Sequence, residues 1–372
     1  MIYADNAATT KLDEEAFAAM KPYLLNDYSN VSQPYSFSRN SKSAIKESRE
    51  IIAKCINAEP DEIYFTSGGS ESDNWVIREC ADFNSERKGI ITSLIEHHAV
   101  LKPCEFLQKN EYPISYLSVD EYGLVDNNGL KEKITDTTKL VSIMFVNNEI
   151  GTVQNIKELA LISHNHGSLF HTDAVQAVGH IKVDVKQLDV DFLSASAHKF
   201  NGPKGMGFLY IKNGINLSSL IYGGAQERGM RAGTENVASI VGMAYALKNN
   251  CKNIEQNSQH LTMLEDILID RLNEYKLNFV RNGDKNHVPG LVSLSFKNFS
   301  GEMLLHRMDL KGICISTGSA CDSKNTQISH VIKSINLSDE YAAGTIRISL
   351  GKCNTVEDVI FIADTLGEIC RK

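Results

Sequence analysis

The stretch "DFLSASAHKFNGPKGMGFLY" places Lys199 directly after an apolar run that predicts a β-strand. Ser194, Ser196 and His198 can donate hydrogen bonds to an anion, and the glycines that follow leave space around the lysine. A lysine beside a cavity becomes a nucleophile once its ammonium form is destabilised, and it then forms a Schiff base with a carbonyl compound. A lone lysine is more often an ordinary surface residue, so this prediction needs partners elsewhere in the chain.

The stretch "FHTDAVQAVG" supplies one partner, because Asp173 ends another predicted strand. A buried carboxylate is unfavourable unless it is paired. A pyridinium nitrogen is a suitable partner, and enzymes that use pyridoxal phosphate place an aspartate there.

The stretch "YFTSGGSESDNW" predicts a strand, a glycine turn and the start of a helix. Gly69 and Ser70 would present free amides to a phosphate. Alternatively, Ser70 is a helix N-cap with Asp73 three residues later. Glu71 and Asp73 would repel a phosphate, so donors elsewhere must offset their charge. Together, the lysine, the aspartate and the helix start predict an aldehyde cofactor that carries a phosphate.

Composition narrows the class of protein. The chain has 372 residues, which suggests about two domains, and 42% of them are hydrophobic. A net charge of −8 argues against direct binding of nucleic acid or of an anionic membrane. Asp5 interrupts any signal-peptide core, and no apolar run approaches the roughly 18 residues of a membrane span. We therefore expect a cytoplasmic protein.

The eight cysteines are expected to be reduced thiols, and none forms a C-x-x-C pair. The patch "HNHGSLFH" contains His164, His166 and His171. It is better explained by a helix end, a turn at Gly167 and a strand, because acidic or cysteine ligands at metal-binding spacing are missing. We expect no metal site.

Alternating strand-like and helical segments predict an α/β fold with a parallel sheet covered by helices on both faces. A helix is predicted over 155–166. In such sheets, ligands bind at the carboxyl ends of the strands. The predicted strands are 62–66, 89–93, 114–119, 140–146, 168–174, 191–197 and 207–211.

The C-terminal part predicts a smaller α+β domain. The region 236–276 is helical, as two helices or one bent helix. We expect a large domain over 16–250, and a small domain formed by 1–15 and 251–372. The remaining predicted elements are the strands 291–296, 313–316 and 345–351 and the helix 355–371.

Taken together, these motifs resemble those of the cysteine desulfurases in the class V aminotransferase group. The resemblance extends over nearly the whole sequence. The resemblance implies the aspartate aminotransferase-like fold (fold type I), with a mostly parallel seven-stranded sheet in the large domain. It also implies pyridoxal 5′-phosphate as the cofactor. The strings that carry it are "YADNAATT", "FTSGGSESDN", "EHHAV", "VNNEIGTVQ", "HTDAVQAVG", "SASAHKFNGPKGMG", "ERGMRAGTEN", "STGSACDS" and "IRISLG".

The resemblance also implies a role for individual residues. Lys199 would form the Schiff base, Asp173 would pair with the pyridine nitrogen, and His97 would stack on the ring and accept a proton. Cys321 would accept the sulfur. Thr234 would reach the phosphate of the other subunit, which implies a homodimer. The remaining implied contacts are Gln176 and Asn148 near the phenolic oxygen, Gly69, Ser70, Ser196 and His198 at the phosphate, and Arg347 with Asn30 at the substrate carboxylate.

The implied reaction converts L-cysteine to L-alanine and leaves a persulfide on Cys321, for Fe–S cluster assembly or tRNA thiolation through a sulfur acceptor protein. The polar tract after Cys321 resembles the subgroup with a long catalytic loop. The alternatives are a selenocysteine lyase, a class V aminotransferase that would not need Cys321, and a non-catalytic sulfur-transfer partner.

Two places depart from the family's pattern. Many relatives have Asn-Pro-Ser-Ser near position 30 and a histidine shortly after it, whereas segment 29–39 here reads "SNVSQPYSFSR". Asp322 directly after the cysteine is also unusual, and its charge would oppose formation of the Cys321 thiolate.

Overall fold

A seven-stranded sheet forms the centre of the larger part of the molecule. The computed structural model describes residues 1–81, 85–318 and 328–371. The strand order is β2-β8-β7-β6-β5-β3-β4. All neighbours are parallel except β8, which is antiparallel to both β2 and β7. The strands are β2 (Ile63–Thr66), β3 (Gly89–Ser93), β4 (Ile114–Leu117), β5 (Thr138–Ser142), β6 (Leu169–Asp173), β7 (Phe192–Ser196) and β8 (Gly207–Ile211).

Successive strand residues enter two different apolar clusters, one on each face of the sheet. Ile90 and Phe192 pack with residues of α3 and α4 on one face. Their neighbours Ile91 and Leu193 pack with residues of α6 on the other face. A sheet buried on both faces produces the continuous apolar strands seen in the sequence. The helices of this part are α3 (Gly69–Cys80), α4 (His98–Lys109), α5 (Asn127–Lys133), α6 (Ile156–Asn165) and α7 (Val185–Leu188).

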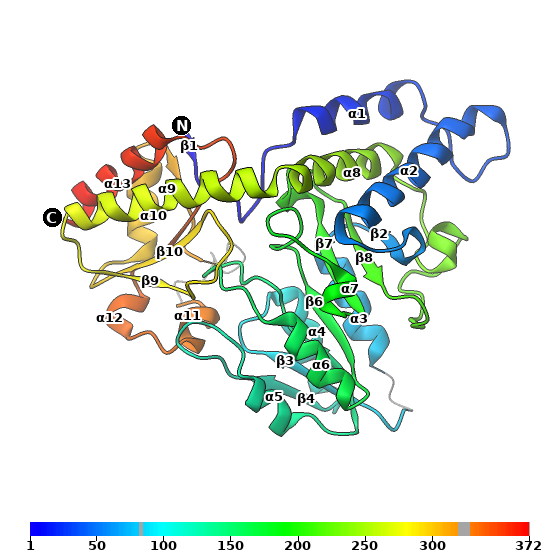
Figure 1. Cartoon of the computed structure of the whole chain (residues 1–372), viewed down its shortest axis with the longest axis horizontal. Helices are drawn as coiled ribbons and strands as arrows, with labels where there is room; N and C mark the ends of the chain where they lie inside the picture. The colour runs from blue at the N-terminus through cyan, green and yellow to red at the C-terminus, as the bar shows by residue number, and fades with distance from the viewer. Residues whose placement is uncertain (82–84, 319–327, 372) are drawn as a thin grey trace.

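Three further helices pack together beside this sheet, where α8 contacts both α1 and α2 (Figure 1). Helix α9 follows α8 after one residue and packs on α13 in the smaller part of the molecule (Figure 1). The helices are α1 (Glu14–Leu25), α2 (Arg39–Ile56), α8 (Val237–Lys252), α9 (Ile254–Glu274) and α13 (Val356–Cys370).

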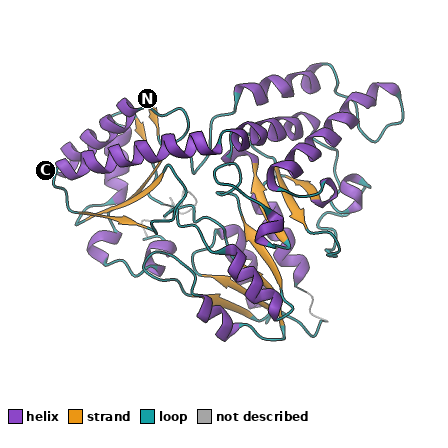
Figure 2. Ribbon diagram, in the orientation of Figure 1, coloured by secondary structure: helices purple, strands orange, loops and turns teal. Residues whose placement is uncertain are grey.

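The smaller part contains a three-stranded antiparallel sheet in the order β12-β10-β9 and a two-stranded parallel pair of β1 and β11 (Figure 2). It has its own apolar cluster, built mainly from α9, β10, β12 and α13. The strands are β1 (Ile2–Tyr3), β9 (Phe279–Asn282), β10 (Leu291–Phe296), β11 (Ile313–Cys314) and β12 (Thr345–Ser349), and the remaining helices are α10 (Gly301–Asp309), α11 (His330–Ser334) and α12 (Asp339–Ala342).

All seven strands predicted for the large sheet are present, and the long helical region is two helices. The predicted end of one strand at residue 146 is wrong, because β5 ends at Ser142. Beyond Ser142 the chain still donates hydrogen bonds to β6, from Ile143 N to His171 O and from Phe145 N to Asp173 O, but not as a regular ladder. The division into domains at 15/16 and 250/251 stays a prediction. Of the helices in the described ranges, none is both long and apolar enough to cross a membrane.

Candidate active site

A cavity of about 280 Å³ opens at the carboxyl ends of β5, β6 and β7. It is lined by residues from seven segments of the chain. Ten of the residues singled out from the sequence line it together: Gly69, Ser70, His97, Asn148, Asp173, Gln176, Ser196, His198, Lys199 and Arg347.

Lys199 ends a short 3-10 turn that follows β7, so the end of a buried strand positions its side chain. The Nζ atom donates to the backbone carbonyl oxygens of Ala7 at 2.6 Å and Ala8 at 2.8 Å. Ala7 O also accepts a hydrogen bond from Gln176 Nε2 at 2.9 Å. The N-terminal segment is therefore part of the site, a role that the sequence reasoning missed.

Asp173 is the last residue of β6 and is 5% exposed. Its Oδ1 accepts a hydrogen bond from Val175 N at 2.9 Å, which fixes the carboxyl group toward the cavity. Burial raises the pKa of Asp173, while His97, the Val175 amide and Lys199 act in the opposite direction. A buried carboxylate that faces a cavity favours a positively charged ligand atom there.

A second carboxyl group, Asp73 on α3, lines the same cavity. It is 1% exposed, and burial together with the charge of Asp173 raises its pKa well above the usual range. His171 Nε2 lies 3.5 Å from Asp73 Oδ1. The imidazole is itself fully buried, and burial lowers the pKa of His171 to about 3, so the ring is neutral at neutral pH.

Serine hydroxyls hold this buried imidazole on both sides. Ser142 Oγ lies 2.8 Å from His171 Nδ1, and Ser194 Oγ lies 3.0 Å from Nε2. Residues from β5, β6, β7 and α3 thus form one polar cluster beneath the cavity, in which the carboxyl groups have no lysine or arginine ion pair among the described residues.

The start of α3 differs from the predicted N-cap. Gly68 is the N-cap residue, with φ of 152° and no side-chain capping hydrogen bond, so the alternative in which Ser70 is the N-cap is wrong. Only glycine is readily accommodated at this φ. A Cβ on Gly69 would lie 2.5 Å from Val175 Cγ2, so the first helical turn packs closely against the loop after β6.

The charge of Glu71 in this first turn is compensated. Arg231 donates to Glu71 from Nε at 2.8 Å and from Nη2 at 3.1 Å. Ser67 N donates to the same carboxylate at 3.0 Å. The pKa of Glu71 is lowered because these hydrogen bonds outweigh its burial. The expected offset of this negative charge is therefore present.

Two histidines flank the cavity in neutral form. His97 is the N-cap residue of α4, and its Nδ1 accepts a hydrogen bond from Ala99 N at 3.1 Å. The neutral ring therefore carries its hydrogen on Nε2. Burial lowers the pKa of His97, and burial lowers the pKa of His198 to about 4. His198 Nδ1 lies 3.1 Å from Thr9 Oγ1.

Arg347 on β12 brings the smaller part of the molecule to the cavity. It is 2% exposed, donates from Nη2 to Asp5 Oδ1 at 2.8 Å, and donates from Nη1 to Asn148 O at 2.8 Å. Its Nε has no hydrogen-bond partner among the described residues. A buried guanidinium with an available donor that lines a cavity suits a carboxylate ligand.

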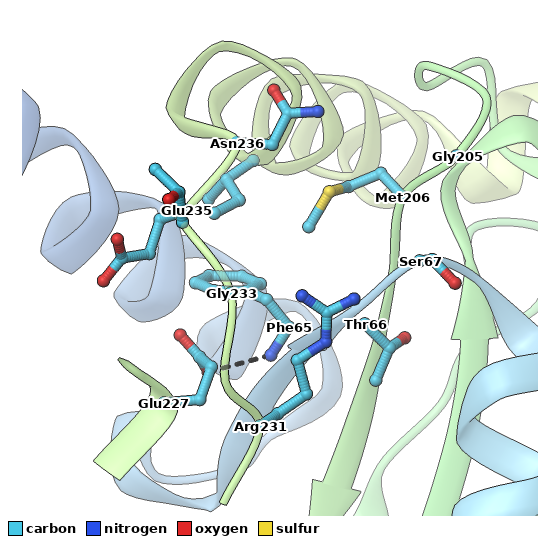
Figure 3. Close-up of a pocket in the computed structure, with 12 residues that line it drawn as sticks. Phe65, Thr66, Ser67, Gly205, Met206, Glu227, Arg231, Gly233, Glu235 and Asn236 are labelled. Carbon is cyan, nitrogen blue, oxygen red and sulfur yellow. Dashed lines mark hydrogen bonds between the residues drawn. The ribbon is translucent and has the colours of Figure 1, made fainter. Parts of the chain in front are cut away.

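The structure does not bring every predicted residue to this cavity. Thr234 lines a separate cavity of about 190 Å³, into which Arg231 and Met206 point (Figure 3). Asn30 is exposed in the loop between α1 and α2, where its Oδ1 accepts a hydrogen bond from Ser32 N at 2.9 Å. Cys321 and Asp322 lie outside the described residues.

The residues of the cavity fit pyridoxal phosphate. Lys199 provides the amine and Asp173 the carboxylate for a ring nitrogen. The uncapped start of α3, with Ser196 and His198, provides donors for a phosphate. The volume lies just below the range of roughly 300–1,000 Å³ typical of ligand sites.

Comparisons with known proteins agree with this geometry. The family model for aminotransferase class V matches residues 2–361. A cysteine desulfurase IscS from Clostridium botulinum is 46% identical over 100% of this chain and 94% of its own length. The corresponding protein from Dictyoglomus turgidum is 47% identical over 100% of this chain and 95% of its own length. The chain belongs to the class V aminotransferase family, within its cysteine desulfurases.

Solved structures give the same result. A NifS-like protein superimposes with a TM-score of 0.93 at 35% identity, covering 99% of this chain and 98% of that chain. An apo cysteine desulfurase from Thermococcus onnurineus superimposes with a TM-score of 0.89 at 26% identity, covering 100% of this chain and 94% of that chain. The expected fold type is therefore confirmed.

Proposed function

We propose that this cysteine desulfurase holds pyridoxal 5′-phosphate through Lys199 and transfers the sulfur of L-cysteine to Cys321, with L-alanine as the second product. The observation that carries the proposal is the meeting of Lys199, Asp173 and Arg347 at one cavity. Lys199 follows β7, Asp173 ends β6 and Arg347 lies on β12. Their amine, carboxylate and guanidinium are the set needed to bind an aldehyde cofactor and an amino acid together.

The cofactor, when bound, supplies an electron sink for the carbon that loses a proton. Asp173 would keep the pyridine nitrogen protonated, and His97 would stack on the ring. Gln176 and Asn148 would serve the phenolic oxygen or its surroundings. Gly69, Ser70, Ser196 and His198 would hold the phosphate, together with Thr234 of a second copy in a homodimer.

Arg347 binds the carboxylate of L-cysteine, assisted by Asn30. The contacts of its Nη atoms with Asp5 and with Asn148 O orient the guanidinium before substrate binds, and Nε stays available as a donor. Such preorganisation reduces the entropy that is lost on binding.

With the cofactor bound, Lys199 Nζ would be the base that removes the Cα proton of the substrate. The carbonyls of Ala7 and Ala8 are positioned to hold the resulting ammonium group. His97 carries its hydrogen on Nε2 in the neutral form, so in this tautomer it donates a proton from that atom, and it accepts one only if the tautomer changes.

The Cys321 thiolate then attacks the sulfur of the substrate. The carbon–sulfur bond breaks, a sulfur–sulfur bond forms, and the electron pair of the broken bond remains with the carbon skeleton, which leaves as alanine after protonation. The persulfide passes to an acceptor protein of Fe–S assembly or tRNA thiolation in the cytoplasm.

We also propose that the chain has the two domains predicted from the sequence, with Cys321 in the smaller domain.

The test incubates the purified holoprotein with L-cysteine and measures alanine and sulfide. Wild type should form both, and Cys321→Ala should retain the visible absorbance of the cofactor but form no protein persulfide. Lys199→Ala should lose that absorbance. Absence of alanine in wild type, or equal persulfide in Cys321→Ala, would overturn the proposal.

The same assay separates the alternatives. Much faster turnover of L-selenocysteine than of L-cysteine would identify a selenocysteine lyase. Formation of a keto acid without sulfide would identify an aminotransferase.

A further inference from the structure

Two cysteines meet where α2 packs on α8, outside the cavity described above. Cys55 is in the last turn of α2, and Cys251 is in the last turn of α8. The Cys251 Sγ atom lies 4.0 Å from the Cys55 carbonyl oxygen, so the two cysteines are neighbours at the contact between α2 and α8. Both side chains pack against the apolar cluster of the large sheet but remain partly exposed.

The environment makes the two thiols unequal. The neighbouring Cys251 thiol, with Lys248 and Lys54 nearby, lowers the pKa of Cys55, although burial opposes the shift. The same contact and burial raise the pKa of Cys251. Because the thiolate is the reactive form, Cys55 is the nucleophile of the pair.

Other described cysteines lack this combination. Cys80 and Cys104 are buried, and burial raises the pKa of each thiol to about 12. Burial also raises the pKa of Cys370 to about 12. Cys353 is exposed, and it provides a matched control for simple accessibility.

We propose that Cys55 and Cys251 form a peroxide-sensitive thiol pair that closes to a reversible disulfide between α2 and α8. This inference does not depend on the proposed function, because neither residue lines the cavity that holds Lys199.

The reaction proceeds in two steps. The Cys55 thiolate attacks one oxygen of a hydroperoxide, the oxygen–oxygen bond breaks, and Cys55 becomes a sulfenic acid. The Cys251 thiol then attacks the Cys55 sulfur, so that a sulfur–sulfur bond forms and hydroxide leaves, taking the Cys251 proton as water. With hydrogen peroxide, the two thiols lose two electrons and two protons in total, and the peroxide becomes two waters.

The experiment treats the full-length holoprotein with a small excess of hydrogen peroxide and maps its peptides without reductant by mass spectrometry. Cys321→Ser is treated in parallel, because a reactive thiol elsewhere could exchange with the pair. We expect a Cys55–Cys251 linked peptide in both proteins, and its disappearance after dithiothreitol.

Single serine variants test the assigned order. Cys251→Ser should retain Cys55 as a sulfenic acid that dimedone captures, whereas Cys55→Ser should show at least about tenfold less oxidation of Cys251. Cys353→Ser should give the wild-type yield of the linked peptide. Circular dichroism of each variant verifies that it is folded.

Two results would overturn the proposal. One is the absence of the linked peptide in both wild type and Cys321→Ser while other thiols are oxidised. The other is equal oxidation of Cys251 with and without Cys55, since Cys251 would then react by itself.

Discussion

Two regions in the large part of the molecule place buried carboxyl groups in opposite environments. Beside β2, Glu227 is paired with Arg49 through two hydrogen bonds, of 2.8 Å and 2.7 Å. At the cavity, burial raises the pKa of both Asp73 and Asp173, and on Asp173 the opposing influences are His97, the Val175 amide and Lys199. A buried carboxylate that is held in an ion pair has a structural role. Carboxyl groups that line a cavity without an ion pair are available to bind a ligand.

The paired region also holds an unusual backbone. Glu227 and Arg228 have φ of 45° and 58°, in the left-handed region that non-glycine residues rarely adopt. Phe65 N donates to Glu227 Oε2 at 2.9 Å, and the Arg49 guanidinium lies 4.3 Å from the centre of the Phe65 ring. The ion pair and these contacts compensate for the strain of that turn.

The largest expected effect comes from breaking the paired region. Glu227→Ala leaves the Arg49 guanidinium buried without its partner, which should lower the free energy of unfolding by about 3–5 kcal/mol. Urea unfolding followed by circular dichroism measures this change. The matched Arg49→Ala, Glu227→Ala double variant should be less destabilised than the sum of the singles. If Glu227→Ala is as stable as wild type, the assignment of this pair to the fold is wrong.

Asp173→Asn should lower activity without lowering stability, the reverse of what is expected for Glu227→Ala. An amide has no charge with which to keep a ring nitrogen protonated, so alanine formation should fall by about 10²–10³-fold. The free energy of unfolding should not fall, because the substitution removes a buried charge beside Asp73. Initial rates and urea unfolding are measured on the same preparation. A loss of stability comparable to that of Glu227→Ala would erase the difference between the two regions.

Arg347 tests an intermediate case, because its charge is both paired with Asp5 and directed to the cavity. Arg347→Lys keeps the charge but removes the planar fork, so KM for L-cysteine should rise by about 10–100-fold while kcat changes less. Steady-state kinetics measure both quantities. An unchanged KM would exclude this residue from substrate carboxylate binding.

Much of the fold, and ten of the sixteen residues that line the cavity, could be predicted from the sequence. Strands that are buried on both faces produce continuous apolar runs in the sequence. Lys199 and Asp173 can be recognised because their reactive side chains stand at the ends of two such runs. The contacts of Lys199 with Ala7 and Ala8 could not be predicted, because backbone carbonyls of alanine leave no signal and the partners are far apart in sequence. The alternative assignment of Ser70 as the N-cap fails because Gly68 occupies that position without a capping side chain, and Ser70 lines the cavity instead.

Asp73 shows a further limit of sequence reasoning. In the sequence it has the spacing of an ordinary first-turn acid of a helix, where negative charge is stabilising. In the structure it is fully buried next to Asp173 and His171, so its charged form is disfavoured instead. Only the packing of α3 on the sheet reveals this environment.

The smallest expected effect is on the pH dependence of the free energy of unfolding, which should distinguish Asp73 from the paired Glu227. The pKa of Asp73 is raised in the folded protein, so between its ordinary value of 3.8 and the folded value the folded state binds a proton that the unfolded state releases. Stability contributed by this group therefore falls as pH rises above about 4, by at most about 1.4 kcal/mol per pH unit. Asp73→Asn removes this slope, so the variant should gain stability relative to wild type as pH rises.

The buried His171 contributes a slope of opposite sign, because its lowered pKa favours the folded state above its ordinary value of 6.5 and destabilises it at lower pH. Burial alone causes the shift of His171, so both proteins should share its slope, which cancels in the difference. Urea unfolding of wild type and Asp73→Asn at intervals from pH 4 to pH 8 isolates the contribution of Asp73. Parallel curves for the two proteins would mean that Asp73 is charged at neutral pH, and the contrast with Glu227 would then rest on Asp173 alone.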